Sequence, residues 1–155
     1  MVTPYIDIYE ADDYFNERMN ISAWEDATDD DGSEGTSRLR ALKMATKIID
    51  RLNFAGNKAV SDQENQFPRG DDAEVPQDIM DACAEIALAL LDGVDPELEF
   101  ENLNMIAQQY SSAKSTYDRS NAAPHIVAGV PSIVAWYLLI PYLRDNKTVD
   151  LHRVS

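Results

Sequence analysis

This 155-residue sequence has few thiol and imidazole side chains, which could act as a nucleophile, a general base or a soft metal ligand. The chain has one cysteine, Cys83, and two histidines, His125 and His152. A catalytic Cys/His dyad needs its thiol and imidazole within hydrogen-bond reach, and these residues lie far apart in the sequence. Cys83 lies on an apolar helical stripe, where a free cysteine is typically buried. We therefore predict an inert core cysteine and a protein that is not an enzyme.

Carboxylates are abundant, and the runs 29–31 and 71–72 could in principle hold a hard cation. A calcium loop, however, needs alternating oxygen ligands, a glycine at the sharp turn and a bidentate glutamate six residues later. The sequence DDDGSEG over 29–35 does not have that spacing. The usual phosphate-loop, dinucleotide, zinc-protease and nucleophile-elbow motifs are also missing from the sequence. We therefore predict no metal site and no cofactor.

Basic side chains recur on one face of a helix that we predict over residues 36–52. Arg40, Lys43, Lys47 and Arg51 follow one another at intervals of three or four residues, which places them on the same side of a helix. They could bind the phosphates of single-stranded DNA, or they could pair with acidic side chains elsewhere. The second alternative is favoured by the 28 Asp and Glu against 13 Lys and Arg, a net charge of -15, because phosphate binding depends on counterion release by Lys and Arg.

Five aromatic residues close together near the N-terminus allow two interpretations. They could form a platform on which single-stranded bases stack, but at helical spacing such residues more often belong to the core. The five are Tyr5, Tyr9, Tyr14, Phe15 and Trp24.

Length and composition indicate one domain from a reducing compartment. A chain of 155 residues buries roughly 70% of its unfolded surface and needs no staples, and a single cysteine cannot form an intramolecular disulfide. The N-terminus lacks the pattern of a signal peptide. The longest apolar run, Ile133–Ile140, is too short to cross a membrane, which takes about 20 residues. We expect synthesis in the cytoplasm and no contact with a membrane.

Hydrophobic periodicity predicts a mainly α-helical fold, a small bundle of four or five helices. Asp7 followed by Glu10 predicts a capping box at the first helix, and Pro141 predicts a kink or break near the end of the last one. We predict one domain over 1–144 and a C-terminal tail over 145–155. The predicted helices cover 8–19, 36–52, 76–93, 96–109 and 133–143, and 21–27 is a further short candidate helix. We also predict a long loop over 57–75 and an extended arm over 109–120.

Several phrases in order resemble head-to-tail adaptor, or head-completion, proteins of tailed bacteriophages. They run from about Tyr5 to Asp145 and cover most of the chain. The phrases are YEADDYFNERMNISAWEDA, ATKIIDRLNFAGNK, FPRG, VPQDIMDACAEIALALLDG and VPSIVAWYLLIPYLRD.

The resemblance implies a structural subunit in the neck of a virion, at the head-tail junction. Its implied partners are further copies of itself in a ring of about twelve, the portal protein, the next tail or neck protein, and packaged double-stranded DNA that passes without tight binding. The helix over 133–143, apolar on all sides, would then be shared between subunits or with the portal. The interface residues expected on this basis are Trp136, Tyr137, Leu139, Tyr142, Leu143, Leu151 and Val154.

Members of the same sequence family are also described as similar to a primosomal single-stranded DNA-binding protein. The resemblance thus offers an alternative, a single-stranded DNA-binding accessory protein that uses the basic residues of 36–52. We expect the adaptor function over this alternative, because gripping a single strand calls for a positive groove and the chain is strongly acidic. Steep salt dependence of oligonucleotide binding would separate the two.

Overall fold

The computed structural model describes residues 2–29, 37–109 and 123–144. Within these ranges the chain is mainly helical, as predicted, and its extended pairing is limited to isolated bridges such as Phe54 with Leu143. The helices are α1 (Ile8–Phe15), α2 (Ser22–Asp26), α3 (Arg38–Asp50), α4 (Gln77–Leu91), α5 (Pro96–Gln109), α6 (Pro124–Val127), α7 (Ile133–Leu139) and the short 3-10 helix η2 (Ile140–Tyr142).

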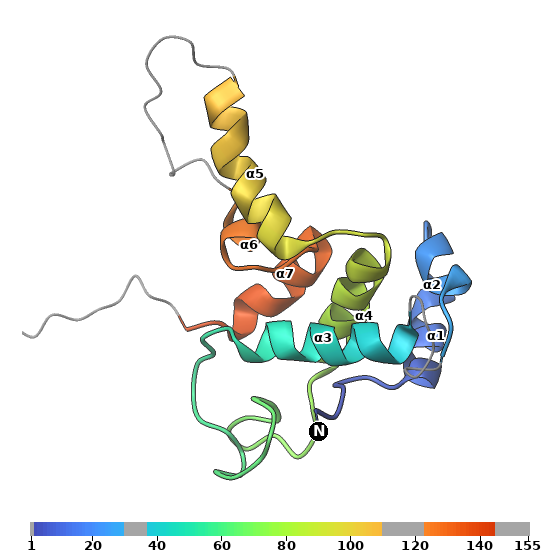
Figure 1. The fold of residues 1–155 in the computed structure, drawn as a ribbon. Helices are drawn as coiled ribbons and strands as arrows, with labels where there is room; N and C mark the ends of the chain where they lie inside the picture. The colour runs from blue at the N-terminus through green and yellow to red at the C-terminus, as the bar shows by residue number, and fades with distance from the viewer. Residues whose placement is uncertain (1, 30–36, 110–122, 145–155) are drawn as a thin grey trace, which may run out of the picture.

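Helix α4 is the centre of the fold, and α1, α2, α3 and α7 all pack against it (Figure 1). Its sequence is apolar on nearly every side, so it can be surrounded by other helices. Eight of its residues are buried. A Schellman motif ends the helix: Gly93 has a φ of 90°, and Val94 N–H donates to the Ala89 carbonyl at 3.1 Å.

Helix α5 extends away from this body and pairs mainly with α6 (Figure 1). The sequence predicted α5, but it did not predict α6, a single turn that begins at Pro124. Proline at the first helical position was the available signal, and one turn of helix has too little periodicity to be detected otherwise. The pairing matters because α5 and α6 form one side of a groove described below.

Most predicted helix ends are close to the observed ones. The capping box is present, since Glu10 N–H donates to Asp7 Oδ1 at 2.8 Å and Asp7 N–H donates to Glu10 Oε2 at 3.2 Å. The first helix ends at Phe15, four residues earlier than predicted, because the chain turns there and reaches Asn20 with a φ of 61°. The last helix stops at Leu139 and tightens into η2 around Pro141.

The long loop between α3 and α4 is held in place by one arginine. Arg69 donates hydrogen bonds to the carbonyls of Ala55 (3.0 Å) and Gln66 (3.2 Å) and to the Gln66 side chain (2.8 Å). Its guanidinium also lies 6.0 Å from the ring centroids of Phe54 and Phe67, both buried. The loop predicted over 57–75 is therefore confirmed as a loop, and a cation satisfies its inward-facing carbonyls.

Two predicted segments lie wholly or largely beyond the ranges that the structure describes. They are the acidic sequence DDDGSEG over 29–35, of which only Asp29 falls in a described range, and the extended arm over 109–120, of which only Gln109 does. The tail over 145–155 lies outside them as well, together with its predicted interface residues Leu151 and Val154.

Candidate nucleic-acid interface

The four basic residues predicted for α3 lie together on one face of that helix. The opposite face is buried against α4 through residues such as Leu42, Ala45 and Ile49. This division follows from the apolar spacing in the sequence, and Ser37 starts the helix by accepting a hydrogen bond from Arg40 N–H at 3.2 Å. We name the outward row the basic stripe. It consists of Arg40, Lys43, Lys47 and Arg51.

The stripe spans twelve residues, from Arg40 to Arg51, which is about 16 Å along the helix axis. Arg40, Lys47 and Arg51 are exposed and Lys43 is half-buried. Arg40 and Lys43 already take part in interactions within the chain. Among the described side chains, no ion pair involves Lys47 or Arg51. The C-terminal half of the stripe is thus the part whose charge is available to a ligand.

Lys47 and Arg51 line a groove between α3, α5 and α6. The groove has a volume of about 900 Å³, within the size range of roughly 300 to 1,000 Å³ that is common for ligand sites. Its apolar surface comes from all three helices, and Met44 and Phe100 are each 47% exposed. The remaining lining residues are Ile48, Leu90, Asp95, Pro96, Glu97, Glu101, Ile126, Val127, Ala128 and Gly129.

The two sides of the groove carry opposite charge. The basic wall, Lys47 and Arg51, belongs to the α3 side, and the acidic wall, Asp95, Glu97 and Glu101, belongs to the start of α5. Asp95 has a local role, because its Oδ1 accepts a hydrogen bond from Glu97 N–H at 3.0 Å. No ion pair joins the two walls among the side chains that the structure describes. The groove therefore combines the cations of Lys47 and Arg51, the carboxylates of Glu97 and Glu101, and apolar side chains from all three helices.

The basic wall was predicted from the sequence, but the other sides of the groove were not. Phe100, Val127 and the acidic wall come from segments that are distant from α3 in the sequence. Met44 could have been found, because it lies on the same helical face as the stripe, one turn after Arg40. The pairing of α5 with α3 across a groove has no local signal.

Arg38, the first residue of α3, has a structural role instead. Its guanidinium lies 5.2 Å from the Trp24 ring centroid and pairs with Asp29 at 2.9 Å. Trp24 in turn donates to Asp12 at 2.7 Å. This arrangement fixes α2 against the start of α3, which aligns the helix that carries the stripe.

The N-terminal aromatic residues form core packing and not a stacking platform. Tyr5, Phe15 and Trp24 are buried and Tyr14 is half-buried, whereas Tyr9 is exposed. Phe15 contacts Trp24 with ring centroids 4.9 Å apart. The interpretation of these residues as core is confirmed for all of them except Tyr9.

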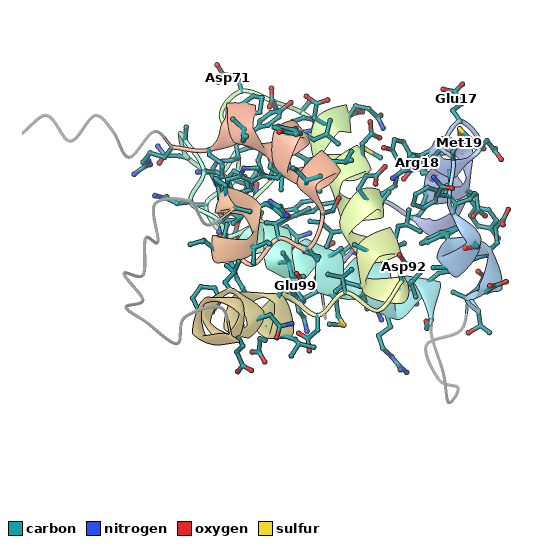
Figure 2. All side chains as sticks on the ribbon, turned by 90° about the horizontal axis from the view of Figure 1, so that it is seen from above. Glu17, Arg18, Met19, Asp71, Asp92 and Glu99 are labelled. Carbon is teal, nitrogen blue, oxygen red and sulfur yellow. The ribbon has the colours of Figure 1, made fainter. Side chains whose placement is uncertain are left out.

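A buried carboxylate ties α1 to α4. Glu85 is 2% exposed, and its Oε1 accepts hydrogen bonds from Tyr14 Oη at 2.7 Å and from Arg18 Nε at 2.9 Å. Burial and the neighbouring carboxylate raise the pKa of the Tyr14 hydroxyl, and the hydrogen bond to Glu85 raises the pKa of Arg18. Figure 2 shows Arg18 beside Glu17 and Met19, at the side of the molecule opposite α7.

A carboxylate, Asp50, also anchors the C-terminal end of α3. Tyr5 donates its hydroxyl hydrogen to Asp50, and Asp50 Oδ1 accepts from Gln66 N–H at 3.1 Å. Burial raises the pKa of Asp50, although the hydrogen bond from Tyr5 acts in the opposite direction. Because Asp50 directly precedes Arg51, this contact fixes the residue at the end of the basic stripe.

The residues expected at a subunit or portal interface are distributed between core and surface. Leu139 is fully buried within the chain, Tyr137 is 66% exposed, and Trp136, Tyr142 and Leu143 are half-buried against the core. The helix that looked apolar on all sides does bury one side on α4. Its exposed apolar residues are Ile133, Val134, Tyr137 and Ile140.

Cys83 is buried, as predicted. It is 0% exposed, its Sγ contacts Thr46 Oγ1 at 3.4 Å, and burial raises its pKa to about 11. Among the described residues no group of three or more His, Cys, Asp or Glu side chains could hold a metal ion. In the same ranges no helix is both long and apolar enough to span a membrane.

Comparison with known proteins identifies a family but no individual relative. A family model described as "Putative DnaT-like ssDNA binding protein" matches residues 3–148. No curated protein and no solved structure matches the chain.

This match corrects the adaptor interpretation. The family is that of a DnaT-like ssDNA-binding protein and not that of a phage head-to-tail adaptor, so the predicted ring subunit and its portal, tail and channel partners are wrong. The sequence phrases behind that prediction are mostly helix patterns, which unrelated helical proteins share. The virion location followed from the adaptor interpretation, and no observation tests it. Because the match extends over nearly the whole chain, the protein belongs to the DnaT-like ssDNA-binding family.

Proposed function

We propose that this protein is a single-stranded DNA-binding accessory protein and that its basic stripe holds the DNA backbone. The observation that carries the proposal is the pair Lys47 and Arg51, which lack ion-pair partners among the described residues and line a groove with an exposed aromatic ring. The family match supports the same ligand. The role is one of binding without catalysis.

The groove combines the two components that single strands require. Lysine and arginine neutralise phosphates and release their counterions, while an aromatic face stacks on an unpaired base without regard to its identity. Phe100 lines the groove from α5, and Lys47 and Arg51 line it from the α3 side. In a duplex the base faces are already stacked on one another and cannot contact an aromatic side chain. Stacking on Phe100 therefore favours a single strand over a double strand.

The strong negative charge of the chain restricts where DNA can bind. A net charge of -15 repels a polyanion from most of the surface. Of the sequence, residues 36–60 have six bases and one acid, whereas residues 61–101 have thirteen acids and one base. Attraction is therefore local to α3, and we expect moderate affinity and a short site.

Fluorescence anisotropy with a labelled twelve-nucleotide strand tests the proposal. We expect saturable binding that weakens as salt rises, and weaker binding of the corresponding duplex. Phe100→Ala should reduce affinity for the single strand by roughly 1 to 3 kcal/mol, the usual value of one stacked base, with little effect on the duplex. Binding that is undetectable at low salt, or equal for both forms, would overturn the proposal.

A further inference from the structure

The groove is chemically asymmetric, and this asymmetry would restrict how a nucleotide can lie in it. Lys47 and Arg51 line it from the α3 side, and Glu97, Phe100 and Glu101 line it from α5. Glu97, Phe100 and Glu101 are three or four residues apart on α5, so they share one helix face. A ligand that satisfies all sides needs an anion at one end, a flat apolar body, and hydrogen-bond donors at the other end.

A nucleotide has these three parts in this order. Its phosphate is repelled by Glu97 and Glu101 and attracted by Lys47 and Arg51, so the backbone must follow α3. The base then stacks on Phe100 of α5, with its hydrogen-bonding edge at the neighbouring carboxylates. Ionised carboxylates only accept hydrogen bonds, so the edge that they face must donate.

Bases differ in this respect. Cytosine and adenine present an exocyclic amino group, and carboxylates of Asp and Glu are the usual acceptors for the cytosine N4 amino group. Thymine presents the O4 acceptor at the same place, which faces a carboxylate with repulsion between lone pairs. Its ring N3–H is a donor, but it is flanked by two carbonyl oxygens.

We propose that the acidic wall makes the groove a base-selective subsite, which prefers amino-bearing bases, cytosine and adenine, over thymine. The phosphate lies on Lys47 and Arg51, the base stacks on Phe100, and its amino group donates to Glu97 or Glu101. This inference rests on the proposed function, because it assigns the base preference of the same site. It also explains why carboxylates line a groove that would bind a polyanion.

The preference can be measured with two strands that differ only at the base edge. Twelve-nucleotide strands of thymidine and of 5-methyl-deoxycytidine share the methyl group and the sugar, so differences in stacking and backbone are small. We expect the native protein to bind the 5-methylcytosine strand about fivefold more tightly, the lower part of the range for a good base contact. Equal affinity for the two strands would overturn the inference.

Two charge-matched variants locate the cause. In Glu97→Gln with Glu101→Gln, the amide can also donate to thymine O4, so the affinity ratio should fall to about one. The control is Asp92→Asn with Glu99→Gln, which removes the same two charges from exposed residues that do not line the groove; Figure 2 labels both residues. It should raise affinity for both strands and leave their ratio unchanged.

The outcomes separate this inference from the function on which it depends. If the native protein binds neither strand at low salt, the proposed function fails. If it binds both strands in a salt-dependent manner, but the ratio is the same in the Glu97 and Glu101 variant as in the native protein, the function stands and the base-selective subsite is refuted. Circular dichroism of each variant confirms that α5, an exposed helix, is intact.

Discussion

Neutralising the basic wall should remove most of the salt dependence of single-strand binding. Each phosphate that a basic residue contacts contributes about -0.7 to the slope of log affinity against log salt for a single strand. Lys47 and Arg51 are the cations of the basic stripe that are available to a ligand, so the slope of the native protein is about -1.4. The double substitution Lys47→Ala with Arg51→Ala removes both contacts and leaves a slope of about zero.

These slopes correspond to measurable changes in affinity. Between 50 and 200 mM salt, the native protein should lose about sevenfold in affinity and the double variant almost none. Anisotropy titrations at four salt concentrations give both slopes. A charge-preserving variant, Lys47→Arg with Arg51→Lys, should keep the native slope.

A second control excludes a general effect of net charge. Asn16→Asp adds a negative charge at an exposed position at the end of α1, away from α3. It should shift affinity slightly at every salt concentration without changing the slope by a full contact. Equal slopes for the native protein and the Lys47 and Arg51 double variant would refute the assignment of the basic stripe as the phosphate-binding surface.

Three further predictions concern the scaffold that holds the stripe. Arg18→Ala should lower the free energy of unfolding by about 3 kcal/mol in urea titrations, because it leaves the buried Glu85 carboxylate without its cation; an unchanged midpoint would contradict this. Cys83, whose pKa is raised from 9.0 to about 11, should resist thiol reagents in the native state. Since the unfolded thiol ionises first, its contribution to stability is complete below pH 9 and should be lost as pH rises toward 11; Cys83→Ala should flatten that decline, as measured by urea midpoints at pH 8 and pH 10.5. Arg69→Ala should leave the helical circular dichroism intact but make the 57–75 loop the first site of limited proteolysis, and equal cleavage rates in both proteins would argue against its anchoring role.

The scaffold and the stripe are connected through the two ends of α3. Arg38 holds the N-terminal end on Trp24, and Asp50 holds the C-terminal end on Tyr5 and Gln66. Between its two ends, α3 is fixed by the packing of its buried side against α4. A helix fixed at both ends and along one side presents its remaining face at a constant orientation, which reduces the entropy that binding would otherwise cost.

The adaptor interpretation, which the family match overturns, also gave the apolar segment over 133–143 a role between subunits. Part of that segment, α7, packs on α4 of the same chain, and Leu139 is fully buried there. An apolar segment indicates burial, but periodicity does not say whether the covering surface belongs to the same chain or to a second one.

The principal helices and the basic stripe could be predicted from the sequence alone, because both depend on local spacing. Apolar spacing located the principal helices, the pair Asp7 and Glu10 specified a cap, and intervals of three and four placed Arg40, Lys43, Lys47 and Arg51 on one helix face. These features depend only on helix geometry, which is the same in every context.

The residues that face the stripe depend on tertiary packing. Whether Lys47 and Arg51 pair with acids or remain available depends on the position of α5, and α5 is placed by packing with α6 and not by any pattern in its own residues. The same packing brings Phe100 and the acidic wall across from α3. The side chains of α3 and α5 that line the groove are about 50 residues apart in the sequence and come together only when the chain folds. Their separation in the sequence therefore does not predict their distance in space.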